Sequence, residues 1–127
     1  MANIHDNEII SYNVDLKNHK ITIQTVQNPS RKSISIVFHD VLAHLFETQL
    51  EDSIILDITK YELSLFINEN RELLEKHRKS CWPMEYNTFE ELEKKLMSEQ
   101  YGYYVILSSY GLNGWVLAKN HEILNDK

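Results

Sequence analysis

The chain places two of its three glycines, Gly111 and Gly114, in one short segment near its C-terminal end. This segment, residues 108–115, lies between two apolar runs at residues 103–107 and 115–118. Glycine and asparagine accept the positive φ angles of tight turns, whereas glycine is costly elsewhere in ordered structure. The pattern therefore predicts two paired strands with a Gly/Asn-rich connection.

Length and composition indicate one acidic domain. With 127 residues, 43% of them hydrophobic, the chain can bury a core, so we expect a single domain over residues 1–127. Its formal net charge is −6. Nucleic acids and anionic membranes favour clustered Lys and Arg, so we expect no direct binding to either.

The cysteine content and the N-terminus point to a reducing compartment. Cys81 is the only cysteine, so no intramolecular disulfide can form. The N-terminus lacks the basic and apolar regions of a secretory signal, and no apolar run approaches the roughly 18–20 residues of a membrane helix. We therefore expect a cytoplasmic protein.

The N-terminal half has the periodicity of strands. Residues 10–16 and 20–26 each alternate apolar and polar side chains, which predicts an antiparallel hairpin with one buried face. Residues 33–38 continue this pattern. Residues 39–49 fit either a helix or a strand, and we favour a strand or irregular structure. Residues 53–58 are apolar and β-branched, typical of a strand buried on both faces.

The middle of the chain predicts two helices. The first covers residues 61–79 and ends before Pro83, which disfavours helical geometry in the residue before it. The second begins at Thr88, where Glu91 completes a capping box, and ends near Glu99. The first helix carries its core stripe at Leu63, Phe66, Ile67, Leu74 and His77.

The remaining segments complete the expected fold. Residues 101–108 carry apolar side chains on both faces and predict a central strand, with residues 115–118 as its neighbour and residues 120–127 as a polar tail. Strands, then helices, then strands indicate an α+β domain. We expect a mainly antiparallel sheet of about five to six strands, with two helices packed on one face.

His39, Asp40 and His44 are the candidate metal ligands. Asp40 and His44 would share a face of a helix, and imidazole with carboxylate suits zinc or iron. The spacing implies no third strong ligand. The alternative is a turn at His39 and Asp40 with a partly buried, hydrogen-bonded His44. A small metal-dependent enzyme that uses these residues is thus one alternative hypothesis, although we expect no cofactor.

The nucleophile candidates favour structural roles. Cys81 has His77 four residues upstream, but a reactive cysteine also needs a lowered pKa and a positioned base. Its place before Trp82 and Pro83, where the helix stops, favours a structural residue. Ser108 and its neighbour lack the Gly-x-Ser-x-Gly elbow. We therefore expect no catalytic residue, and favour a protein that is not an enzyme.

Aromatic rings and carboxylates are interleaved after the first predicted helix. Rings supply desolvated area and carboxylates steer a basic partner, so this mixture is typical of protein-binding surface. The alternative is a solvated helix face. The candidate protein-binding residues, including two from the glycine-rich connection, are Trp82, Glu85, Tyr86, Glu90, Glu91, Tyr110 and Trp115.

Three segments, residues 33–46, 53–58 and 104–118, resemble a group of small uncharacterised Bacillus-type proteins. Their genes lie beside polymorphic toxins, and they are regarded as immunity proteins. The resemblance implies a bacterial inhibitor that occludes the active site of a cognate toxin, for example a basic nuclease. It rests on strand patterns and a Gly-Trp ending, so no active-site residue is carried over. A regulatory subunit that self-associates through a sheet edge remains a further alternative.

Overall fold

A computed structural model describes residues 4–77 and 82–125. Within them the chain forms eight strands and three helices. In chain order these are β1 (Glu8–Asp15), β2 (Lys20–Gln27), β3 (Lys32–His39), β4 (Ala43–Glu47), β5 (Ile54–Tyr61), α1 (Leu63–Glu69), α2 (Arg71–His77), α3 (Phe89–Ser98), β6 (Gly102–Tyr110), β7 (Asn113–Ala118) and β8 (Asn120–Asn125).

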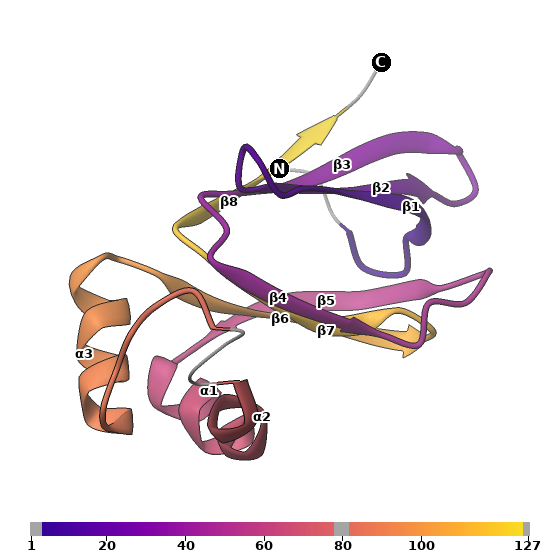
Figure 1. The fold of residues 1–127 in the computed structure, drawn as a ribbon. Coiled ribbons are helices and arrows are strands. Elements are labelled where there is room, and N and C mark those ends of the chain that lie inside the picture. The colour runs from indigo at the N-terminus through magenta and orange to yellow at the C-terminus, as the bar shows by residue number, and fades with distance from the viewer. Residues whose placement is uncertain (1–3, 78–81, 126–127) are drawn as a thin grey trace.

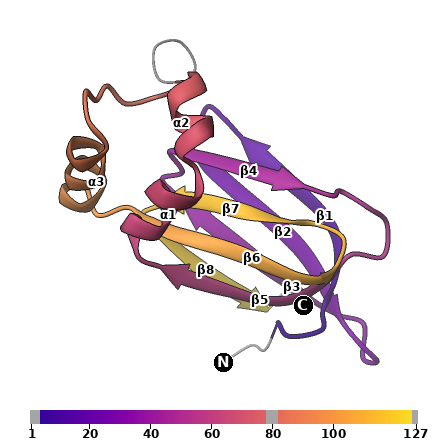
Figure 2. The ribbon, with the colours of Figure 1, turned by 90° about the horizontal axis from the view of Figure 1, so that it is seen from below.

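The strands form one antiparallel sheet that folds back on itself. Its order is β4-β7-β6-β5-β1-β2-β3-β8. The sheet bends between β1 and β5, which pair only at Glu8 and Ile54. Strands β1, β2, β3 and β8 form an upper layer, and β4, β5, β6 and β7 form a lower layer beneath it (Figure 1). The helices lie outside the lower layer, toward one end of it (Figures 1 and 2).

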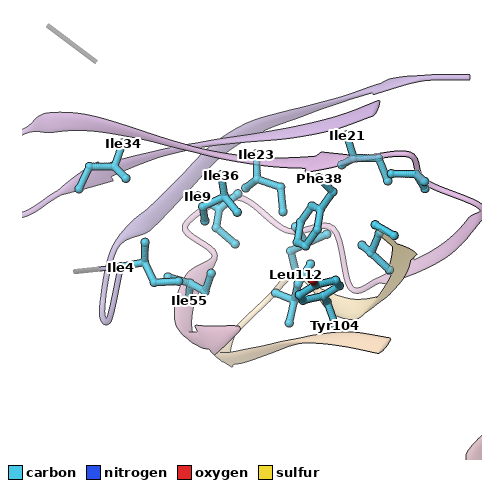
Figure 3. Packing of buried hydrophobic residues seen from close by; sticks show 14 residues of the cluster. Ile4, Ile9, Ile21, Ile23, Ile34, Ile36, Phe38, Ile55, Tyr104 and Leu112 are labelled. Atoms are coloured by element: carbon cyan, nitrogen blue, oxygen red, sulfur yellow. The ribbon is translucent and has the colours of Figure 1, made fainter. Parts of the chain in front are cut away.

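The main core fills the space between the two layers. Alternate residues of β2 and β3, such as Ile21, Ile36 and Phe38, point toward Tyr104 and Ile55 of the lower layer (Figure 3). All five side chains are at most 4% exposed. Burying one large apolar side chain contributes about 1.5–3 kcal/mol, so this cluster holds the layers together.

A second core lies between the lower layer and the helices. Phe66 of α1, Leu74 of α2 and Leu92 of α3 are fully buried there against Trp115 and Leu117 of β7. The strand period sends the neighbouring Val116 to the opposite face, into the first core. Residues 115–118 therefore serve both cores, which explains why the whole run is apolar.

The predicted fold class is confirmed, but the element counts were wrong. The domain is α+β with an antiparallel sheet, yet the described residues hold eight strands and three helices instead of five to six strands and two helices. The prediction of a polar tail at residues 120–127 was also wrong, because Asn120–Asn125 forms β8 and pairs with β3. Ile123 stands opposite Ile36 in this pairing and packs against the core, so one apolar residue anchors a polar strand.

The first predicted helix is broken in the structure. Asn70 separates α1 from α2, with φ −121° and ψ 23°. Its side-chain Nδ2 donates to the carbonyl of Phe66 at 2.9 Å, and such local bonds compete with the helical ladder. Residues 78 and 79, which the prediction included, lie outside the described residues. None of the described helices is long and apolar enough to cross a membrane.

The start and end of α3 agree with the prediction. The Thr88 hydroxyl accepts a hydrogen bond from the Glu91 amide at 3.1 Å, and Glu99 follows the last helical turn. The Glu91 carboxylate reaches one residue further back than a standard capping box, because it accepts from the Asn87 amide at 3.0 Å.

The glycine-rich connection joins β6 to β7 as predicted. Gly111 has φ 82°, and a Cβ atom there would overlap the Ser53 side chain. The Ser53 hydroxyl accepts from the Leu112 amide at 2.9 Å, which fixes the turn against the start of β5. Strand β5 is not buried on both faces, however, since Leu56 is 40% exposed.

Candidate functional site

The three candidate metal ligands, His39, Asp40 and His44, form no metal-binding group in the described part of the chain. Residues 43–47 form a strand, as the sequence favoured, so Asp40 and His44 do not share a helical face. His39 Nε2 lies 2.9 Å from Glu122 Oε1, while the His44 ring packs on Phe46 at 5.1 Å between centroids. Burial lowers the pKa of His44. No group of three or more His, Cys, Asp or Glu in the described residues could hold a metal ion.

The nucleophile candidates are described only in part. Cys81 lies outside the described residues. Ser108 donates its hydroxyl to the Leu112 carbonyl, and Ser109 donates to the Ile54 carbonyl at 3.4 Å. Both serines therefore hold the β6–β7 turn, in agreement with the structural reading of this segment.

Three of the predicted binding residues are mainly parts of the second core. Trp115 and Tyr86 are only 7% and 6% exposed, and the Tyr86 hydroxyl donates to the Leu74 carbonyl at 3.0 Å. Trp82 is half-buried, and its ring stacks on that of Phe66 with 6.2 Å between the ring centroids. The contacts of Tyr86 and Trp115 explain why aromatic residues occur at these positions.

The acidic candidates lie on and before α3. Glu85 and Glu90 are exposed, whereas Glu91 caps the helix and lies 3.9 Å from Lys95. Tyr110 is 53% exposed but lies at the β6–β7 turn, at the end of the lower layer opposite the helices (Figure 2). The seven predicted binding residues therefore do not form one surface.

The structure instead leaves an open seam between strands β1 and β4. After Glu8, β1 has β2 as its only strand neighbour in the described part of the chain, and β4 has only β7. The two free edges approach each other where the Tyr12 and Phe46 rings meet edge-to-face at 5.2 Å. We call this gap, between residues 10–16 and residues 43–50, the β1/β4 seam.

Exposed apolar side chains are concentrated along the β1/β4 seam. Ile10 is 51% exposed, Tyr12 38% and Leu16 78% on the β1 side; Leu45 is 37% and Leu50 48% exposed on the β4 side. The sequence predicted a buried face for residues 10–16. The alternation holds at Tyr12 and Val14, which stand opposite Ile23 and Ile21, but a bulge interrupts it at Ile10, and of residues 10–16 only Val14 packs against the first core.

A carboxylate-rimmed groove occupies one end of the seam, with a volume of about 480 Å³. Its apolar lining includes Ile10, Tyr12 and Leu50. Its acidic lining consists of Glu8, Glu51 and Asp52, and the groove-lining residues include no Lys, Arg or His. This end of the seam therefore combines apolar area with negative charge.

A second groove, of about 600 Å³, lies at the other end of the seam, between β4 and α2. Leu16, Leu45 and Leu73 line it together with Trp82 and Trp115. The indole N–H groups of both tryptophans are buried, without a hydrogen-bond partner among the described residues. This indole groove is where two of the predicted binding residues do meet.

The seam was not predicted from the sequence because a period-two pattern shows only that one face of a strand is apolar. It does not report what covers that face. Two features of the sequence together could have indicated the seam: the apolar alternation of residues 10–16 and the short, ambiguous strand at residues 43–47. A short edge strand covers little area, so it leaves apolar side chains of a neighbouring strand exposed.

The chain matches no protein-family model, no curated protein and no solved structure at a significant level.

Proposed function

We propose that this protein is a non-enzymatic binding module that inhibits a partner protein, in the manner of an immunity protein occluding its toxin. The observation that supports the proposal is the β1/β4 seam. It presents exposed apolar side chains beside two free strand edges, whereas the described His, Cys, Asp and Glu residues form no metal-binding group.

Free strand edges are an established means of protein recognition. A partner segment can add to an exposed edge through main-chain hydrogen bonds, and neighbouring pockets then select its side chains. Edges that are not used for binding are usually shielded, because they otherwise cause aggregation. Strand β4 carries no proline and a single carboxylate, Glu47, so charge and proline shield its edge little.

Charge favours a basic partner. The formal net charge of −6 would speed encounter with a basic protein, for example a toxin that acts on nucleic acid. The surface that completes the encounter would be the seam, where the exposed apolar area can be desolvated.

The test is co-expression of the tagged protein with the products of its neighbouring genes, followed by purification and mass spectrometry. We expect a stoichiometric partner that is toxic when expressed alone. Leu50→Asp, in the seam, should weaken its capture at least tenfold. Leu124→Asp changes a leucine of similar exposure, 42% against 48% for Leu50, on the outer face of the upper layer and should leave capture unchanged.

The free edge of β4 also supports self-association as a second candidate. Light scattering over a range of concentrations separates the two functions. If the protein is a dimer that dissociates in the Leu45→Asp variant, and no partner is captured, the results would favour a self-associating regulatory subunit. A monomer that captures a toxic partner would favour the inhibitor.

A further inference from the structure

We propose that the carboxylate-rimmed groove binds an extended, cationic segment of the partner protein, with a Lys or Arg side chain seated over Glu51 and Asp52. This inference rests on the proposed function and specifies the chemistry of the partner at one end of the β1/β4 seam. It follows from the charge, the apolar lining and the free backbone edge of the groove.

The charge of the groove is unbalanced. Glu8, Glu51 and Asp52 line it, and of these three only Glu8 has an ion-pair partner among the described residues, Arg31, whose guanidinium lies 3.1 Å away. Among the described residues no ion pair engages Glu51 or Asp52. Both side chains are exposed, so a cationic group can approach them without first displacing a protein partner.

The apolar lining suits the stem of a long basic side chain. Ile10, Tyr12 and Leu50 are 51%, 38% and 48% exposed beside the carboxylates. Lys and Arg pack their methylene groups along apolar surface while the charged head remains at its edge. An acidic segment would meet like charge here, and a purely apolar one would leave the carboxylates partly desolvated without a partner.

The backbone of β1 favours an extended conformation of the bound segment. Strand β1 pairs with β5 only at Glu8 and Ile54, and its pairing with β2 has a bulge between Ile9 and Ser11. Residues 8–12 line the groove, but Glu8 pairs with Ile54 and the Ile9 amide donates to the Ser53 carbonyl at 2.8 Å, so the free edge in the groove covers residues 10–12, a length of about 10 Å at the usual rise of a strand. A segment of about three extended residues therefore fits beside this part of β1.

The test is selection of random twelve-residue peptides displayed on phage against the immobilised protein. Recovered peptides are then titrated against wild type and the double variant Glu51→Lys/Asp52→Lys. The matched control is Glu72→Lys/Glu75→Lys, which makes the same change of charge at two exposed positions of α2. Circular dichroism checks that both variants are folded.

We expect the selected peptides to be enriched in Lys and Arg and poor in Pro. They should lose at least tenfold in affinity for Glu51→Lys/Asp52→Lys and much less for the α2 control. In the ¹⁵N spectrum of the protein, the amides that shift on peptide addition should be those of residues 8–12 and 49–53.

Peptides without positive charge, or peptides that bind both variants equally, would overturn this inference while leaving the seam as a binding surface. Failure to recover any peptide would also overturn it. The proposed function fails separately, when co-expression yields no partner protein. The two experiments therefore distinguish a wrong partner chemistry from a wrong function.

Discussion

Ser53 shows how single residues set the geometry of the molecule. Its hydroxyl donates to the Leu50 carbonyl at 2.6 Å and accepts from the Leu112 amide at 2.9 Å. The side chain is 2% exposed, so both bonds are shielded from water. Ser53 thus joins the loop before β5 to the β6–β7 turn, and it fixes the wall of the carboxylate-rimmed groove.

Gly111→Ala should lower the free energy of unfolding by about 2 kcal/mol or more. A non-glycine residue at φ 82° is strained, which alone costs about 1–3 kcal/mol, and the added methyl group would overlap Ser53. Urea unfolding monitored by tryptophan fluorescence measures the loss. Gly102→Ala is the control, because the nearest obstacle there is the flexible end of Lys60 at 2.8 Å. Equal stability of the two variants would contradict this account of the turn.

Tyr103 makes stability sensitive to alkaline pH. Burial, followed by the hydrogen bond its hydroxyl donates to Glu69 at 3.0 Å, raises the pKa of Tyr103 from about 10 to about 12. The folded state therefore keeps this proton when the unfolded state has lost it. The contribution is complete below pH 10 and is lost as the pH rises toward 12.

Tyr103→Phe should accordingly reduce the fall in unfolding free energy between pH 9.5 and 11.5, because the phenolic proton is removed from both states. Some slope should remain, since burial also raises the pKa of Tyr101 and Tyr104. Urea titrations at several pH values measure the slope. Tyr110→Phe, at an exposed position, is the control, and a slope unchanged by Tyr103→Phe would contradict the assignment.

At the scale of elements, the sequence predicted what local patterns control. The β1–β2 hairpin, β3, β6 and β7 follow from alternation, and α3 follows from its capping residues. The break at Asn70 and the strand β8 could not be predicted in this way. A side-chain bond to Phe66 decides the first, and pairing with the distant β3 decides the second. Neither is visible in the periodicity of a single segment.

Thr88→Ala should destabilise the protein by about 1 kcal/mol, because the Glu91 amide would lose its acceptor at the start of α3. Thr88→Ser keeps the hydroxyl and should stay within a few tenths of a kcal/mol of wild type. Thermal unfolding by circular dichroism compares the three proteins. If alanine and serine were equally tolerated, the cap would not contribute to stability.

At the scale of the whole molecule, the position of the β1/β4 seam is a consequence of how the sheet folds. The sheet folds back on itself where β1 meets β5. The C-terminal end of β1 therefore lies near β4 without pairing to it. Tyr12 and Phe46 touch across the gap, but their strands share no pairing. The candidate site could not be predicted from the sequence, since it lies between segments whose contact depends on the complete fold.

The inner and outer faces of the upper layer differ in polarity. Most of its inner face is apolar and covered by the lower layer, whereas its outer face carries polar residues such as Ser35, which donates to Gln24 at 2.8 Å. Leu124 stands on this outer face. Five of the ten exposed large apolar side chains of the described residues lie along the seam, and the outer face serves as an internal control for binding.

Amide hydrogen exchange of the protein alone and in complex with its co-purified partner tests the central claim most directly. We expect slower exchange on binding at residues 10–16 and 43–50, with little change on the outer face of β2, β3 and β8. Protection confined to that outer face, or to the helices, would contradict the β1/β4 seam as the binding site.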